Sequence, residues 1–177
     1  FYIQMSYIFT SESVSEGHPD KIADQISDAL VDAGLKAGDE TTRVAVETLV
    51  TTNYVVLAGE VKNFNVSNEE VEQIIRDKVK WIVDNKTINN QLHSQSADIG
   101  LGTNDFGAGD QGLMFGYACN QNEAYLPAAI HYSHEILKNL KQKRLDGFEY
   151  LGPDAKSQVS VEYEGSEVKR IDQVVVS

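Results

Sequence analysis

The sequence has one cysteine, few basic residues and no long apolar run. Cys119 has no second cysteine with which to form an intrachain disulfide, and we expect it to be a small core residue in a reducing compartment. The 15 lysine and arginine residues stand against 27 aspartate and glutamate residues, a net charge of −12. That balance disfavours a broad surface for nucleic acid or anionic membrane, and no stretch approaches the about 20 apolar residues that span a bilayer. We therefore expect a cytoplasmic protein that binds neither nucleic acid nor membrane.

Residues Gly17–Lys21 place an imidazole, a carboxylate and an amine where a turn is expected to become a helix. Pro19 suits the first helical position, and the free backbone donors of a helix start attract anions such as phosphate. His18 and Lys21 would donate charge-assisted hydrogen bonds to that anion. Asp20 would need a hard cation such as Mg²⁺ between itself and the phosphate. The segment therefore indicates a metal-nucleotide site.

A simpler interpretation stays open for the same segment and for the acidic residues that follow it. In that interpretation Ser15 caps the helix, while His18 is an ordinary surface residue. Asp24, Asp28 and Asp32 continue at intervals of four residues, which is more typical of a solvated helix face than of a metal site.

The spacing of apolar residues predicts an opening strand, three helices and two hairpins. The helices are expected over Pro19 to about Lys36, Asn68 to about Val83 and Pro127 to about Leu145, and the hairpins over Arg43–Val50 with Tyr54–Val61 and Gln158–Tyr163 with Glu167–Val176. Ser67 and Glu70 form a capping-box pattern before the second helix. Hairpins and helices alternate without a long βαβ repeat, so we predict an α+β fold.

Glu47 and Glu60 lie within the two β-rich runs of the first hairpin. Either side chain could face the interior, where an unpaired carboxylate is costly and a cation or a substrate ammonium would remove that cost. Alternation alone slightly favours the other arrangement, in which both point to solvent from the polar face of the sheet.

The chain from Ser94 to Gly109 contains four glycines and little periodicity, which predicts a mobile loop of the kind that closes over substrates. His131 and His134 are three residues apart on a predicted helix, but without a third clustered ligand we favour a role other than metal binding. His93 has no predicted role.

Three longer motifs point to one family. They are Phe9–Glu16 leading into Gly17–Lys21, the glycine-rich run Gly107–Ala118, and Pro153–Val159. In order and spacing they resemble S-adenosylmethionine synthetase (methionine adenosyltransferase), and the resemblance runs from about Tyr7 to Ser177. Separate motifs in register are far more specific than a single glycine pattern.

The resemblance implies sheets with helices on one face, divided into an N-terminal domain at 1–98, a flexible active-site loop at 99–109 and the beginning of a central domain at 110–177. The loop is shorter here, over Gly100–Phe106, than in many relatives. Family members are about twice this long, so we expect a truncated chain in which Met5 is the original start. Full-length relatives form a homodimer or a dimer of dimers.

The resemblance also implies a role for individual residues. His18 would stabilise the leaving oxygen of ATP, with Asp154, Ala155, Lys156 and, less directly, Asp110 forming the nucleotide site. Glu60 and Gln95 would bind L-methionine. Asp20 would bind Mg²⁺ and Glu47 would bind K⁺.

The implied reaction is the formation of S-adenosylmethionine from ATP and methionine, with release of phosphate and diphosphate. Relatives supply further phosphate, magnesium and adenine contacts from sequence beyond the position of Ser177, so we expect this chain to be inactive alone. Two alternatives are a non-catalytic interaction subunit of a full-length synthetase and a magnesium-nucleotide domain without methionine chemistry.

Overall fold

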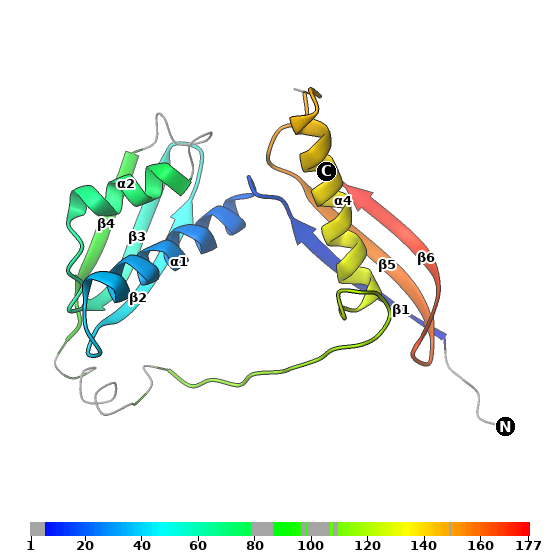
Figure 1. Ribbon diagram of the computed structural model, residues 1–177, viewed down its shortest axis with the longest axis horizontal. Helices are drawn as coiled ribbons and strands as arrows, with labels where there is room; N and C mark the ends of the chain where they lie inside the picture. Colours follow the sequence, from blue (N-terminus) through cyan, green and yellow to red (C-terminus); the bar gives the residue numbers. More distant parts are fainter. Residues whose placement is uncertain (1–5, 79–86, 97, 99–106, 108–109, 149) are drawn as a thin grey trace. The chain divides into compact units, whose positions relative to one another are not determined.

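The structure is a computed structural model that describes residues 6–78, 87–96, 98, 107, 110–148 and 150–177 (Figure 1). The elements in chain order are β1 (Ser6–Val14), α1 (Pro19–Ala37), β2 (Arg43–Val50), β3 (Tyr54–Lys62), α2 (Asn68–Lys78), β4 (Thr87–Ser94), α4 (Ala128–Leu145), β5 (Lys156–Glu164) and β6 (Glu167–Val176). They form two compact units, and each is described by itself. Unit 1 contains residues 1–18 and 114–177, and unit 2 contains residues 19–113.

Unit 2 is a three-stranded sheet in the order β2-β3-β4 with α1 and α2 on one face (Figure 1). Apolar side chains recur along α1 at helical spacing and meet alternate residues of β3. The fully buried core consists of Ile22, Ile26, Leu30, Val55, Leu57, Val71 and Ile75. Burial of such side chains, each contributing about 1.5 to 3 kcal/mol, explains why the helices cover this face and leave the other face of the sheet open.

The first hairpin pairs β2 with β3 in antiparallel register, so that Glu47 lies opposite Ala58 and Glu60 lies opposite Ala45. Gly59 makes this register possible. Its φ is +133°, and a Cβ built there would lie 2.0 Å from the carbonyl oxygen of Ala45. Only glycine tolerates both the backbone conformation and this approach of the neighbouring strand.

Strand β4 was not predicted from the sequence. It pairs in parallel with β3, which makes β3-α2-β4 a crossover unit at the edge of an otherwise antiparallel sheet. Only Ile88 and Leu92 in this strand are apolar and pack against the core. A strand with two Asn residues and one Gln residue carries little of the alternation from which strands are recognised.

Unit 1 is a three-stranded antiparallel sheet in the order β1-β5-β6, with α4 on one face (Figure 1). A small core of Ala128, Ala129, Val159, Val161 and Tyr163 lies between α4 and the sheet. Burial raises the pKa of the Tyr163 hydroxyl, because the phenolate form loses hydration in the interior.

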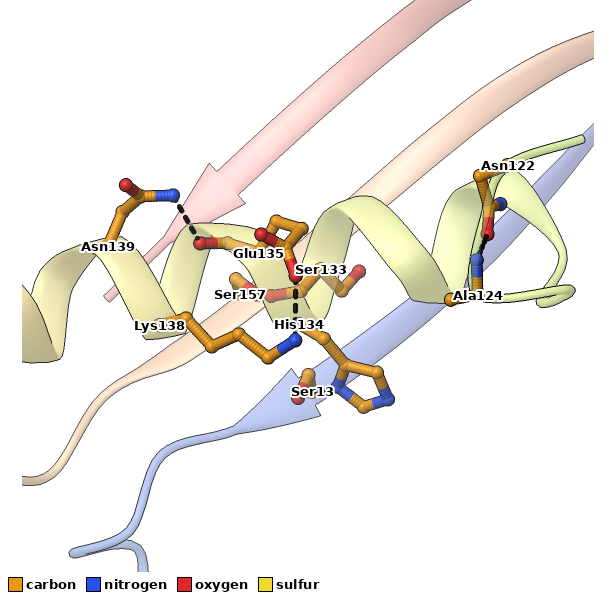
Figure 2. A network of polar contacts seen from close by, with 9 residues as sticks. All are labelled: Ser13, Asn122, Ala124, Ser133, His134, Glu135, Lys138, Asn139 and Ser157. Carbon is orange, nitrogen blue, oxygen red and sulfur yellow. Dashed lines mark hydrogen bonds and ion pairs between the residues drawn. The ribbon is translucent and has the colours of Figure 1, made fainter.

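Serine hydroxyls fasten α4 to this sheet, and three of these serines, Ser13, Ser133 and Ser157, are drawn in Figure 2. The buried Ser133 hydroxyl donates to the carbonyl of Ser11 at 3.0 Å, and the Ser157 hydroxyl donates to the carbonyl of Ser133 at 2.7 Å. The Ser13 hydroxyl lies 2.7 Å from Nδ1 of His134. His134 therefore contacts Ser13 at the end of β1, a pairing that no local sequence pattern predicts.

Most predicted elements are confirmed. Both hairpins and the helices beginning at Pro19 and Asn68 are present, and the last predicted helix begins one residue after Pro127. The capping box is formed, with Ser67 N donating to Glu70 Oε2 at 2.9 Å and Glu70 N donating to Ser67 Oγ at 3.2 Å.

Some predictions remain outside what the structure describes. Residues 79–83 of the second predicted helix lie outside the described residues, as do residues 99–106, 108 and 109 of the predicted active-site loop. The division at 98 and 110 stays a prediction, although β1 lies in one sheet with β5 and β6. No helix among the described residues is long and apolar enough to cross a membrane.

Candidate functional site

Two of the motifs that suggested the family meet in unit 1. After β1 ends at Val14, the chain continues beside the segment that precedes β5. Ser15 N donates to Ala155 O at 2.9 Å and Gly17 N donates to Pro153 O at 2.9 Å. The Ser15 hydroxyl donates to Pro153 O and accepts from Ala155 N, both at 2.6 Å. We call this set of four hydrogen bonds between residues 15–17 and 153–155 the latch.

The latch corrects one interpretation made from sequence. The Ser15 side chain does not serve as the predicted helix cap, because its hydroxyl is used by residues 153 and 155. Ser15 O instead accepts a hydrogen bond from His18 N at 3.1 Å, which closes the turn immediately before α1. His18 and Lys156 consequently follow directly on two segments that are hydrogen-bonded to each other, although they are far apart in sequence.

Glu16 lies within the latch and turns towards α4. Its Oε2 accepts from Lys141 Nζ at 2.5 Å and its Oε1 accepts from Arg144 Nη2. The side chains of Glu16 and Arg144 are 27% and 26% exposed, so this pair is better shielded from solvent than an ordinary surface salt bridge. It ties the latch to the last turns of α4.

The predicted phosphate ligands of unit 1 are accessible. His18, Ala155 and Lys156 are half-buried, and Asp154 is exposed. The Lys156 ammonium forms an ion pair with Glu12 Oε1 at 3.0 Å, with both side chains partly open to solvent. A phosphate group would compete with this carboxylate for the ammonium, and an exposed pair of this kind is weak enough to exchange.

Asp20 lies in the first turn of α1, which begins at Pro19 as predicted. Its carboxylate is exposed. The N–H groups in the first turn of this 19-residue helix have no acceptor within the helix and carry partial positive charge suited to an anion. Asp24, Asp28 and Asp32 are exposed along the same helix, the arrangement expected of a solvated face.

Three further candidate residues lie on the open face of the unit 2 sheet or at its edge. Glu47 and Glu60 are on neighbouring strands and diagonal to each other in the register, so their Cβ atoms are about 7 to 8 Å apart. Gln95 follows β4, and its N–H donates to Val61 O at 2.9 Å, next to Glu60. Of the two arrangements considered for the glutamates, the structure has the one in which both face away from the helices. Their ligands stay predictions.

His93, for which no role was predicted, also belongs to this group. It lies beside Glu60 in the parallel pairing of β3 with β4, and its Nε2 is 3.4 Å from Glu60 Oε1. No local sequence signal marks this pair, because it depends on a strand pairing that was not predicted.

Asp110 and the glycine-rich run that follows are exposed. Asp110 Oδ1 accepts from Gln111 N at 2.7 Å. Leu113, Met114 and Phe115 are 80%, 87% and 90% exposed, which is unusual for adjacent large apolar side chains. The predicted contact of Asp110 with nucleotide stays a prediction.

Some candidate residues fit the implied cations. Asp20 offers one hard carboxylate, and Mg²⁺ in nucleotide sites takes one or two carboxylates together with phosphate oxygens and water. Glu47 offers the oxygen atoms that a hard monovalent cation prefers. No group of three His, Cys, Asp or Glu side chains suited to a metal is found among the residues that the structure describes.

Comparison with known proteins identifies the family of this α+β chain. The family model described as "S-adenosylmethionine synthetase, N-terminal domain" matches residues 6–103, and the one described as "S-adenosylmethionine synthetase, central domain" matches residues 105–177. The chain belongs to the S-adenosylmethionine synthetase family, as its motifs predicted.

Individual relatives agree. An S-adenosylmethionine synthase of Paramagnetospirillum magneticum is 52% identical and one of Pelagibacter ubique is 48% identical, each over 97% of this chain and 48% of the relative. A solved structure, "Structure of an Unusual S-adenosylmethionine synthetase from Campylobacter jejuni", superposes with a TM-score of 0.81 at 35% identity, over 96% of this chain and 47% of that one. The chain thus spans about half the length of the relatives it matches.

Proposed function

We propose that this chain contributes the first part of an active site that forms S-adenosylmethionine from ATP and L-methionine. The observation that carries the proposal is the latch. Its hydrogen bonds hold the turn before His18 against the segment before Lys156, and the two side chains that would contact the triphosphate begin from one hydrogen-bonded support.

The reaction needs positioning and positive charge rather than a protein nucleophile. The methionine sulfur donates a lone pair to C5′ of ATP, the C5′–O bond breaks, and its electrons leave with the triphosphate, which water then cleaves to diphosphate and phosphate. His18 would donate a hydrogen bond to the departing oxygen, and Lys156 would bind the phosphate chain. Mg²⁺ bound by Asp20 would neutralise phosphate charge.

Methionine would be held by groups of unit 2. The Glu60 carboxylate, with a side chain 27% exposed, would accept hydrogen bonds from the ammonium group, and the Gln95 amide would orient the rest of the amino acid. Glu47 would bind K⁺ from the same sheet face. The proposal includes a full-length protein that forms a homodimer or a dimer of dimers in the cytoplasm.

The test measures ligand binding to the purified chain by calorimetry. We expect Mg-ATP to bind and Lys156→Ala to weaken binding by about tenfold, the loss of one charge-assisted contact. Lys169→Ala is the matched control, because Lys169 also pairs with a glutamate on a strand, Glu164, at 2.7 Å, and lies outside the proposed site. Equal affinities for the two variants would contradict the phosphate assignment.

Methionine distinguishes a synthetase from a magnesium-nucleotide domain. The proposal predicts that methionine binds and that Glu60→Ala and Gln95→Ala each abolish its binding, while Mg-ATP binding persists. No S-adenosylmethionine should form from ATP, methionine, Mg²⁺ and K⁺, because half the length of the relatives is not represented. Product formation would refute the predicted inactivity.

A second candidate is a non-catalytic subunit that binds a full-length synthetase. The observation in its favour is the exposure of Leu113, Met114 and Phe115, since adjacent exposed apolar side chains mark interaction surfaces. Light scattering of the chain mixed with a full-length synthase tests it. A stable complex in which the rate of the full-length synthase is changed would favour this candidate, and two separate species would exclude it.

A further inference from the structure

We propose that Glu16 is a positioning residue for the phosphate site. It would fix the turn that carries His18 by anchoring it to α4. The inference rests on the proposed function, since it concerns the same triphosphate, but it assigns a role to a residue for which the sequence motifs predict none.

The geometry of unit 1 supplies the argument. The backbone of residues 15 and 17 is bonded to Ala155 and Pro153, which fixes the turn along the direction of the strands. All four hydrogen bonds of the latch join the turn to the same neighbouring segment, residues 153–155. Glu16 adds an attachment to a second element, because its two carboxylate oxygens bind two different cations of α4, Lys141 and Arg144.

The helix to which Glu16 is tied is itself rigidly held. The buried residues Ser133 and Ser157 connect α4 to the sheet through side-chain hydrogen bonds, and Leu137 on the same helix is buried. The turn, the segment before β5 and α4 therefore form one three-way junction. His18 is the next residue after the turn, and Lys156 is the next residue after the segment 153–155. The placement of both side chains relative to each other therefore depends on the junction.

Because Glu16 is negatively charged, the direction in which its replacement changes anion affinity tests the inference. A carboxylate near a phosphate site repels the ligand, so removing its charge should strengthen anion binding if electrostatics alone matter. If Glu16 acts by positioning, Glu16→Gln should instead weaken binding. We expect a loss of about tenfold, the lower end of the range known for residues that orient metal-ligating side chains.

The experiment titrates the whole purified chain with Mg²⁺ and inorganic tripolyphosphate and measures the dissociation constant. The matched control is Glu135→Gln, which makes the same chemical change in another ion pair of α4, that of Glu135 with Lys138 at 2.7 Å (Figure 2). The control should bind within about twofold of the original chain. A merely structural role would lower the thermal stability of Glu16→Gln without changing its affinity while folded.

Two more variants keep the test decisive. Glu16→Asp retains the charge but shortens the reach by one methylene, and it should also weaken binding, which electrostatics does not predict. Arg144→Gln combined with Glu16→Gln should bind no more weakly than Glu16→Gln alone, because loss of the Glu16 carboxylate already breaks the ion pair with Arg144. If Glu16→Gln does not fold, Glu16→Asp still decides the question.

The outcomes separate the inference from the proposed function. If the unaltered chain does not bind Mg-tripolyphosphate, the proposed function is wrong and the inference with it. If it binds and the Glu16 variants bind equally or more tightly, the inference is overturned and the proposed function stands. Weaker binding by both Glu16→Gln and Glu16→Asp, with an unchanged Glu135→Gln, supports the inference.

Discussion

Replacing Gly59 by alanine tests the close packing of β2 against β3, the two strands that carry Glu47 and Glu60. Residue 59 has a φ of +133°, and an added Cβ would lie 2.0 Å from Ala45 O and 3.1 Å from the carbonyl carbon. The backbone conformation alone costs a non-glycine residue about 1 to 3 kcal/mol, and separating the strands to relieve the clash adds about 1 to 3 kcal/mol. We therefore expect Gly59→Ala to lower the free energy of unfolding by about 4 kcal/mol.

The assay is thermal and chemical denaturation followed by circular dichroism. A loss of about 4 kcal/mol corresponds to a fall in Tm of about 15 to 30 °C for a unit of this size. Gly116→Ala is the control, because a Cβ there meets no atom within 4 Å, and it should change stability by no more than about 0.5 kcal/mol. Equal stabilities of the two variants would refute the close approach of β2 and β3 at Gly59.

Three further predictions concern the core, a helix cap and pH. Ile26→Ala, at a fully buried position, should cost about 2 to 5 kcal/mol, whereas Leu35→Ala, at a position 56% exposed, should cost less than about 1 kcal/mol in the same denaturation assay. Ser67→Ala should cost about 1 kcal/mol by removing the cap of α2, and a loss below the error would show that the cap contributes nothing. Hydrogen bonds from Ser6 and Arg170 lower the pKa of Glu162. The carboxyl of Glu162 therefore binds a proton more readily in the unfolded chain than in the folded one. Its contribution to the free energy of unfolding is complete above pH 4.5 and is lost as the pH falls through the lowered pKa of the folded state. Ser6→Ala should weaken that acid dependence in urea titrations, and an unchanged pH profile would contradict it.

Local patterns predicted the hairpins and helices because each has its own periodicity. The capping box at Ser67 and Glu70 and the proline at the start of α1 mark element boundaries by local hydrogen bonding and backbone restriction, which sequence reveals directly. Strand β4 was not predicted, because its stability comes from pairing with β3 rather than from the β-propensity of its own residues.

The sequence allowed individual site residues to be named, but it did not allow us to predict which of them lie next to each other. His18 and Lys156 stand out by their motifs, whereas the hydrogen bond of Ser15 with Pro153 joins residues 138 positions apart. That contact follows from β1 pairing with β5, and no local pattern states which strands will pair. Glu16 and His93 were missed for the same reason, because their partners come from α4 and β3.

The most direct test of the account is a map of backbone amide chemical shifts as Mg-ATP is added to the chain. We expect the largest changes at Gly17, His18, Ala155 and Lys156, the residues in and next to the latch. Changes confined to other parts of the chain at saturating Mg-ATP, with these four amides unmoved, would contradict the claim that the latch supports the triphosphate.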